Sequence, residues 1–468
     1  MDAPQCPGCR ERDARIAKLE RRVAELEALV RDLLRRLGGN ASNSSLPPSA
    51  NPPGAPVPVQ KKKSARRPGG QPGHPPHLRQ LAPPERVNKT VRFVPKECQH
   101  CQAMLPKEAG PNDPPPTRHQ VAELPELTAI ITEYQGHART CPCCGEVTQA
   151  PIPAEIRAHS CGPLLTATMS YFAGRHHVGK RGVEEIVEDV FDAPVSLGTV
   201  SALEQEMSQA LAPAHREALA VVQQAAVKNV DETGWKQAGR KCWLWVAATQ
   251  SVAAFVIHAR RSWEALTVLL GETIQGILIS DRWGTYNQVP VSRRQVCWAH
   301  LKRDFQKCVD RGGKAKALGA EGLMIVKKVF KAWHSFRGGG CSRDQLQDRL
   351  WPIARRLDRL LQRGCASSDH ATAEFCANLL VLGEALWLFM IEEDVEPTNN
   401  HAERLLRRGV LWRKNAFGCH SEAGCRFVER ILTVVQTLRL QQRRVLSFLY
   451  ETLRAHRAGI KTPALALE

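Results

Sequence analysis

Three acidic residues stand in surroundings that suit chemistry on an anionic substrate. Asp231 lies in the segment DETGW, Asp281 in SDRWGTYN and Glu403 in NNHAER. The pattern predicts that a short apolar strand ends in Asp231 and that another strand ends in Asp281, so both carboxylates can face one crevice at the edge of a sheet. Glu403 falls on a predicted helix among basic side chains: Arg404, Arg407, Arg408, Arg413 and Lys414. An acid in so basic a setting either caps the helix or takes part in chemistry.

Each acid also has an ordinary structural explanation. An aspartate at a strand end commonly makes a turn or a helix cap. If Asn400 caps its helix, Glu403 occupies the third helical position, where a capping box places a glutamate, and it can also pair with Arg407 one turn on. Glu232 is expected on the opposite face of its strand if the strand continues past Asp231. The reserve candidates for the acidic positions are Glu232, Asp304, Glu396 and Glu422.

Two CxxC pairs predict a structural zinc site. They occur in the segments CQHC and CPCCG, and Zn²⁺ is readily enclosed by four thiolates from two such turns. The expected ligands are Cys98, Cys101, Cys141 and Cys144. Cys143 can substitute for one ligand, and His100 or His119 can compete. The alternative is two unrelated cysteine turns, which the matched spacing disfavours.

Apolar residues near the N-terminus follow a heptad pattern. β-branched residues occupy the first three a positions and leucine occupies every d position: Ile16, Leu19, Val23, Leu26, Val30, Leu33 and Leu37. This pattern favours a parallel two-stranded coiled coil, in which Arg15 faces Glu20 of the partner helix. The alternative is an amphipathic helix packed on its own chain. The preceding CPGC segment, with Cys6 and Cys9, cannot complete a zinc site by itself.

Charge and composition indicate a polyanionic partner. The chain has 468 residues and a formal net charge of +18, an excess that favours binding to nucleic acid. At roughly 150 residues per domain, this length allows about three domains. Residues 39–85 are rich in Pro, Gly, Ser and Asn without apolar periodicity, which predicts a disordered linker. Its basic run is expected to contact DNA through Lys61, Lys62, Lys63, Arg66 and Arg67.

The sequence pattern predicts neither a membrane span nor a secretory signal. The longest apolar run begins at Leu379, contains Glu384 and is shorter than the ~18 apolar residues of a membrane span. We therefore expect a buried helix there. The N-terminus is too charged to form the apolar region of a signal peptide. A reducing cytoplasm would keep the 16 cysteines as thiols or metal ligands.

Helical and β-rich segments alternate in the rest of the chain. Residues 162–225 are predicted to be helical, and the break DAPVS with a cap at Ser196 suits a helix-turn-helix, although any short helical hairpin has the same pattern. Further strands are expected in CWLWVAAT, VAAFVIHA and GILISDRWGTYN. RRQVCWAHLKRDF predicts a strand that passes into a basic helix, and the chain is then helical to about Glu393.

The acids and their surroundings resemble an RNase H-like, DDE-type transposase of the insertion sequence 66 family. The segments SNSSLPPSA, GGQPGH, CWAHLKRDF and NNHAERLLR and both CxxC pairs resemble that family in the same order, over nearly the whole chain. One departure is Thr398, where many relatives carry aspartate. The resemblance implies that Asp231, Asp281 and Glu403 bind two Mg²⁺ ions, which Mn²⁺ can replace. It also implies that the helices between Asp281 and Glu403 interrupt the catalytic fold.

The expected architecture is a multidomain α+β chain. We expect a CxxC segment and dimeric coiled coil (1–38), a disordered basic linker (39–85), a zinc-binding module (86–158), a helix-turn-helix-like DNA-binding region (159–225), an RNase H-like α/β catalytic core in two parts (226–306 and 394–420), an all-helical insertion between them (307–393) and C-terminal helices (421–468).

The resemblance implies cleavage at the ends of an insertion sequence and strand transfer into target DNA. The DNA phosphates would be held by Arg404, Arg407, Arg408 and Lys414. The implied partners are element ends and target DNA, a second copy of the chain and small helper proteins encoded by the same element. The implied location is the bacterial cytoplasm, at the nucleoid. Rival functions are a nuclease without strand transfer, a zinc protein that binds DNA without catalysis, and a coiled-coil scaffold.

Overall fold

The computed structural model describes residues 15–27, 30 and 80–466. The chain divides into two compact units: Pro58–Ala129, and Met1–Val57 together with Ile130–Glu468. The predictions for Cys6 and Cys9, and for the basic run between Lys61 and Arg67, lie outside the described residues. The described part of the smaller unit, residues 80–129, is mostly irregular and includes a short 3-10 helix, η2 (Pro84–Arg86).

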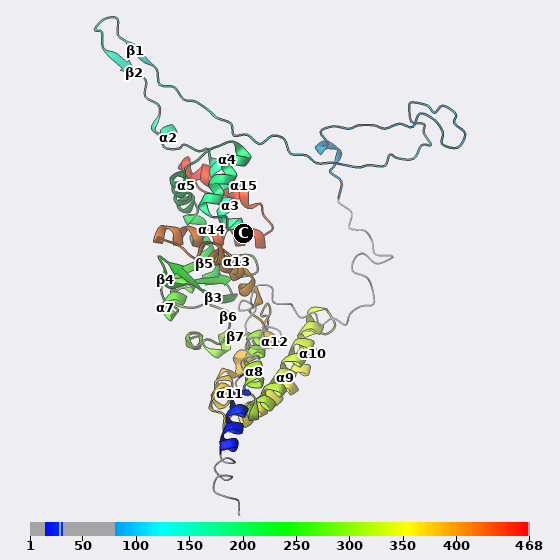
Figure 1. Ribbon diagram of the computed structural model, residues 1–468, viewed down its shortest axis with the longest axis vertical. Helices are drawn as coiled ribbons and strands as arrows, with labels where there is room; N and C mark the ends of the chain where they lie inside the picture. Colours follow the sequence, from blue (N-terminus) through cyan, green and yellow to red (C-terminus); the bar gives the residue numbers. More distant parts are fainter. Residues whose placement is uncertain (1–14, 28–29, 31–79, 467–468) are drawn as a thin grey trace, which may run out of the picture. The chain divides into compact units, whose positions relative to one another are not determined.

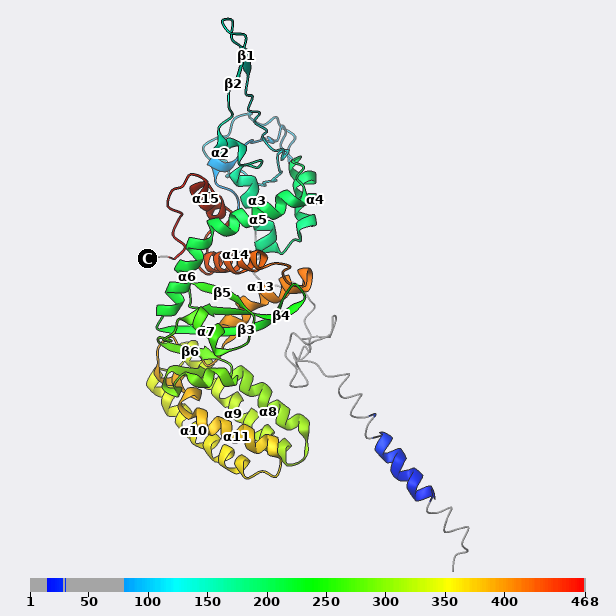
Figure 2. The same cartoon turned by 90° about the vertical axis from the view of Figure 1, so that its left-hand side faces the viewer.

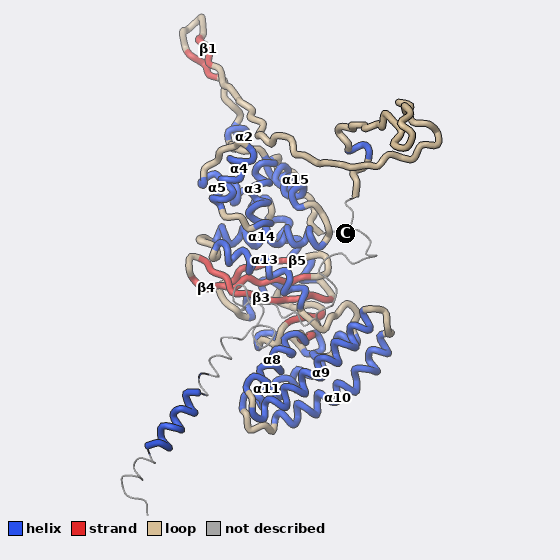
Figure 3. The backbone as a smooth tube through the Cα atoms, turned by 45° about the vertical axis from the view of Figure 1, so that its right-hand side comes forward, coloured by secondary structure: helices blue, strands red, loops and turns tan. Residues whose placement is uncertain are grey.

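A mixed five-stranded sheet lies at the centre of the larger unit, in the order β5-β4-β3-β6-β7. Three strands of this sheet form antiparallel pairs: β3 (Val227–Gln237), β4 (Arg240–Ala248) and β5 (Ala253–His258). Two shorter strands, β6 (Ile277–Ser280) and β7 (Arg294–Val296), continue the sheet in parallel from β3. In Figure 3 the sheet lies between helices. The chain is therefore a mixed α/β protein with a sheet core.

Strand β3 does not end at Asp231, which corrects the boundary expected from the sequence. It continues to Gln237, because Ala238 and Gly239 adopt positive φ angles and turn the chain directly into β4. A two-residue turn of this kind matches the twist of antiparallel strands and extends their pairing. Asp231 therefore lies within the strand, opposite Val246 of β4.

Helix α14 (Glu422–Leu440) covers the free edge of the sheet. Three alternate backbone N–H groups of β5 donate to its side chains, at 3.0, 3.0 and 2.5 Å: Ala253 to Thr437, Phe255 to Thr433, and Ile257 to Glu429. Acceptors four residues apart lie on one face of a helix. They satisfy donors that an exposed edge strand would leave unpaired.

Several helices share one hydrophobic core with the sheet. They are α3 (Pro163–His176), α4 (Lys180–Phe191), α5 (Leu197–Ala210), α6 (Ala212–Gln224), α7 (Trp263–Leu270), α13 (Asn400–Ala416), α14 and α15 (Val445–Arg457). Figure 2 shows α13 and α14 beside β4 and β5.

The predicted break between α4 and α5 is present, and Ser196 Oγ accepts the Thr199 N–H at 3.1 Å, which confirms the expected cap. The DNA-reading role of this hairpin stays a prediction. Before α3, the hairpin of β1 (Ala138–Thr140) and β2 (Val147–Gln149) leads into α2 (Ala154–Arg157).

A second helical group packs around its own core, which also includes residues of β6 and β7. It contains α8 (Trp298–Arg311), α9 (Gly313–Arg337), α10 (Arg343–Cys365), α11 (His370–Leu382), η5 (Gly383–Leu386) and α12 (Leu388–Ile391) (Figure 1). Two 3-10 turns, η3 (Gly284–Gln288) and η4 (Val291–Arg293), precede β7. Within the described chain, only the stretch His370–Ile391 has the length and hydropathy of a membrane span, and 56% of its apolar 18-residue window is buried. It is thus weak evidence for a span, and its burial is typical of a core segment.

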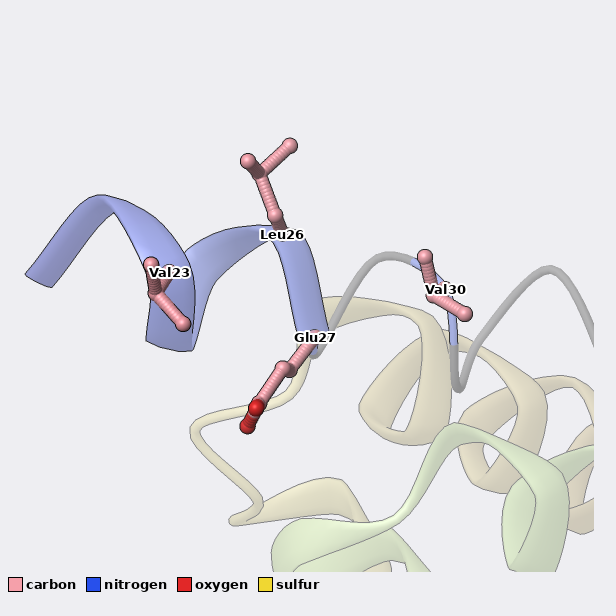
Figure 4. A pocket seen from close by; sticks show the side chains of 4 residues that line it. All are labelled: Val23, Leu26, Glu27 and Val30. Carbon is pink, nitrogen blue, oxygen red and sulfur yellow. The ribbon is translucent and has the colours of Figure 1, made fainter. Parts of the chain in front are cut away.

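Residues 15–27 form a helix whose predicted heptad residues are exposed in the single chain. Ile16, Leu19, Val23, Leu26 and Val30 are between 45% and 56% exposed. Val23, Leu26 and Val30 line a shallow open pocket with Glu27 (Figure 4). The apolar stripe is therefore available to a partner helix, and the coiled coil stays a prediction.

Candidate functional site

The three predicted acids come from three elements that meet at the middle of the sheet. Asp231 lies in β3, Asp281 directly follows β6, and Glu403 lies in the first turn of α13. β6 is paired with β3, and α13 packs against β3 and β4. The charges of Asp281 and Glu403 both act on Asp231, so the fold brings the three carboxylates within electrostatic range of one another.

These acids lie in an environment that disfavours their ionised forms. Burial raises the pKa of Asp231 well above its ordinary value, and the charges of Glu232, Asp281 and Glu403 raise it further. Burial also raises the pKa of Glu403; Arg303 opposes this shift, and Asp281 adds to it. A bound cation would reverse this balance, because it stabilises ionised carboxylates.

Asp281 is held from both its side chain and its backbone. Its Oδ1 accepts the Trp283 N–H at 2.9 Å, and its carbonyl oxygen accepts from Arg294 Nη2 at 2.9 Å. The buried Arg294 also donates to Asn287 Oδ1 at 2.7 Å. This network fixes the chain at the point where it leaves β6.

Glu232 is occupied by partners of its own. It follows Asp231 in a continuous strand and therefore faces the other side of the sheet, as expected. Its carboxylate accepts from Arg261 Nε and from Tyr286 Oη, both at 2.7 Å. Arg261 also lies 3.9 Å from Asp281 Oδ2, so Glu232 holds an arginine beside the acids. Burial raises the pKa of Glu232 and Asp281 raises it further, whereas both partners oppose the shift.

The other reserve acids lie in different surroundings. Asp304 of α8 pairs with Arg282 at 2.7 Å and with Lys307 at 3.0 Å. Glu396 forms an ion pair with an arginine of α9, and Glu422 is exposed at the start of α14.

The capping-box explanation for Glu403 is wrong. α13 begins at Asn400, so the preceding Asn399 holds the N-cap position and Glu403 is the fourth helical residue. Across the described residues, no side chain caps this helix. Asn399 instead donates Nδ2 to the Val230 carbonyl at 2.7 Å and accepts from Asn229 Nδ2 at 2.9 Å. The Asn399 side chain therefore binds β3 and does not cap α13.

Asn399 also connects α13 to the start of α8. Its backbone N–H donates to Cys297 Sγ at 3.1 Å, and the Trp298 N–H donates to the Pro397 carbonyl at 2.8 Å. The strand that carries Asp231 and the helix starts that carry His300 and Glu403 therefore meet at one buried asparagine. In the sequence this residue is visible only as the first asparagine of the pair NN. The spacing of residues does not show that it joins a strand to two helices.

A second group of possible ligands was not identified from the sequence. Among the residues that the structure describes, one set of three potential metal-binding atoms lies within 4.8 Å: those of Cys297, His300 and Glu403. Burial raises the pKa of Cys297 to about 12. Burial, reinforced by Arg303, lowers the pKa of His300 to about 4. The CxxH spacing within CWAHLKRDF was the signal, because it places both side chains at the start of α8.

Each CxxC pair forms a tight turn. Hydrogen bonds from backbone N–H groups lower the pKa of Cys98, with Cys101 the largest contributor and His100 next. The pKa of Cys141 is lowered in the same way, chiefly by Cys144. Such turns favour thiolates, the form that binds metals. The two pairs belong to different units, and the shared zinc site stays a prediction.

The basic residues of α13 serve more than one purpose. Arg404, Arg407 and Lys414 are exposed and Arg408 is half-buried, whereas Arg413 donates to the Gly234 carbonyl within the fold. The pKa of Arg175 in α3 is lowered by burial and then by Arg439 and Arg408, so these three arginines form a positively charged cluster.

Comparison with known proteins places this site in a family. A model described as "Transposase IS66 family" matches residues 159–426, and a family of unknown function (DUF6444) matches residues 2–80. The uncharacterized protein y4qI of Sinorhizobium fredii is 28% identical over 192 residues, which cover 38% of this chain and 35% of that relative's length. The first match covers more than half of the sequence and includes all three acids. This chain belongs to the IS66 transposase family.

Proposed function

We propose that this protein cleaves DNA at the ends of an insertion sequence and transfers the freed strands to target DNA, with Asp231, Asp281 and Glu403 as the catalytic acids. The observation that carries the proposal is the convergence of these carboxylates from β3, β6 and α13, with each neighbouring charge raising the pKa of Asp231. Carboxylates that repel one another when ionised are stabilised by a cation bound between them.

The donor set fits hard divalent ions such as Mg²⁺, because all three residues offer carboxylate oxygens. When bound, two such ions would activate the attacking oxygen and stabilise the leaving one. The family membership supports the use of divalent ions, and Mn²⁺ is the expected substitute. In the first step, water attacks the phosphodiester at the element end and a 3′-hydroxyl leaves. In the second, that hydroxyl attacks a target phosphodiester and a new 3′-hydroxyl leaves.

The remaining segments would hold DNA and assemble the complex. Exposed Arg404, Arg407 and Lys414, together with Arg408, lie on the helix that carries Glu403 and are placed to contact phosphates. We assign residues 1–38 to dimerisation, 39–85 and 159–225 to DNA binding, 86–158 to zinc binding, and 226–306 with 394–420 to an RNase H-like core. Residues 307–393 form the insertion and 421–468 the C-terminal helices. Helper proteins and a nucleoid location belong to the same proposal.

Neutral substitutions test the catalytic assignment. Asp231→Asn, Asp281→Asn and Glu403→Gln keep side-chain size but remove the negative charge that a metal ligand needs. Each variant should fold and bind end DNA like the parent yet cleave it orders of magnitude more slowly. Glu393→Gln, an exposed change shortly before the same helix, is the matched control. Cleavage by Glu403→Gln within a few-fold of the parent would contradict the assignment.

Two further measurements separate this function from its rivals. Joining of cut ends to a target plasmid distinguishes a transposase from a nuclease that stops after cleavage. Neutralising the basic run of the linker should flatten the slope of log affinity against log salt, because fewer counterions are released. An unchanged slope would move the DNA contact elsewhere.

A further inference from the structure

We propose that His300 and Glu403 together bind one divalent ion, which makes His300 an additional ligand in the active centre. The inference deepens the proposed function and rests on it for the role of Glu403. It assigns a purpose to the CxxH spacing at the start of α8, which the catalytic acids leave unexplained.

The geometry of the two side chains carries the proposal. His300 Nδ1 and Glu403 Oε1 lie 3.5 Å apart. Over the described part of the chain, both atoms are buried and neither has a hydrogen-bond partner. Their separation exceeds the roughly 2.7–2.9 Å of a charge-assisted hydrogen bond. It is close to the roughly 3.0–3.4 Å between neighbouring ligands that each bind one ion at about 2.1 Å.

Cys297 differs from the other two members of the cluster. It is fully buried, and its sulfur already accepts the Asn399 N–H at 3.1 Å. The side chains of His300 and Glu403 are 23% and 33% exposed, so parts of both lie at the solvent although the two facing atoms are buried. Cys297 therefore anchors the start of α8, and the two atoms that lack a hydrogen-bond partner are the ligands.

One positive charge must move when the ion binds. Arg303 Nη2 lies 3.9 Å from the same oxygen of Glu403 and is one turn along α8 from His300. Its side chain is partly exposed and can turn toward solvent or toward a DNA phosphate. Arg303 thus partly neutralises the negative charge of Glu403 in the absence of a cation, and a bound cation would replace it in that role.

The donor set also predicts which ions bind best. Mg²⁺ prefers oxygen ligands, whereas an imidazole nitrogen favours first-row transition metals in the order Mn²⁺ < Fe²⁺ < Co²⁺. A site with one nitrogen and one carboxylate should therefore bind Mn²⁺ more tightly than Mg²⁺. The preference should depend on His300.

Equilibrium binding of Mn²⁺ to the full-length protein tests this directly. The free-ion signal in electron paramagnetic resonance gives the Kd for Mn²⁺, and competition gives that for Mg²⁺. His300→Ala should weaken Mn²⁺ binding by about tenfold or more and change Mg²⁺ binding by less than about threefold. His300→Asp, which restores an oxygen ligand, should recover ion binding with a smaller preference for Mn²⁺. His370→Ala, an exposed histidine at the start of α11, is the control.

The outcomes separate this inference from the proposed function. If His300→Ala leaves the Kd for Mn²⁺ within twofold while Glu403→Gln weakens it, the inference is wrong and the catalytic role of Glu403 stands. If neither variant changes binding, both are wrong. A thiolate-to-metal absorption band with Co²⁺ that Cys297→Ser abolishes would make Cys297 a ligand and overturn the two-ligand assignment.

Discussion

Replacing Asn399 by alanine should separate the strand of Asp231 from the helix of Glu403. The side chain is fully buried and makes two hydrogen bonds, to the Val230 carbonyl at 2.7 Å and from Asn229 Nδ2 at 2.9 Å. Each buried group left without a partner costs about 1–3 kcal/mol. We therefore expect Asn399→Ala to lower the free energy of unfolding by about 2–6 kcal/mol.

A double-mutant cycle shows whether the two asparagines act together. Asn229→Ala leaves only Asn399 Oδ1 unpaired and should cost about 1–3 kcal/mol. In the double variant both members of that hydrogen bond are gone, and mainly the Val230 carbonyl stays unsatisfied. The combined loss should therefore fall short of the sum of the single losses by about 2–6 kcal/mol, the cost of two unpaired groups.

Urea denaturation followed by tryptophan fluorescence measures these differences, since Trp235 and Trp245 are buried in the sheet. Cleavage of end DNA should fall more than DNA binding in Asn399→Ala, because Glu403 loses its position relative to Asp231. Asn415→Ala, an exposed change on the same helix, should alter stability by less than about 0.5 kcal/mol. Additive single losses, or a loss in Asn399→Ala no larger than in this control, would refute the reasoning.

Burial raises the pKa of Glu429 to about 7, so the stability it contributes is present below about pH 4.5 and is lost as pH rises through 7. Glu429→Gln keeps an acceptor for the Ile257 N–H and should remove this loss of stability at high pH. Denaturation at pH 5 and pH 8 measures the difference in the free energy of unfolding. An equal difference in parent and variant would contradict the prediction. The full-length protein should sediment as a dimer at tens of micromolar and Leu26→Glu as a monomer, because a charge in the heptad seam disrupts packing; a monomeric parent would exclude the coiled coil. Elemental analysis should find one zinc per chain in the parent and in Cys143→Ser but not in Cys98→Ser, and zinc-free parent protein would count against the site.

Local patterns in the sequence were sufficient for much of the fold. The β-rich run VAAFVIHA and the passage from β7 into α8 depend on neighbouring residues, and both elements are present as expected. The cap at Ser196 was predictable because its partner, Thr199, is three residues away. The family followed from short motifs in a fixed order.

Only the tertiary structure decided how the candidate site is held together. Asn399 fails to cap α13 because its side chain bonds to Asn229, 170 residues earlier in the chain, and no local spacing encodes that contact. The approach of His300 to Glu403 likewise depends on how α8 and α13 pack. Asp231 lies within its strand because the turn at Ala238 and Gly239 extends the pairing with β4. Sequence spacing specifies which residues share a turn or a face, whereas burial and long-range hydrogen bonds determine which of them meet.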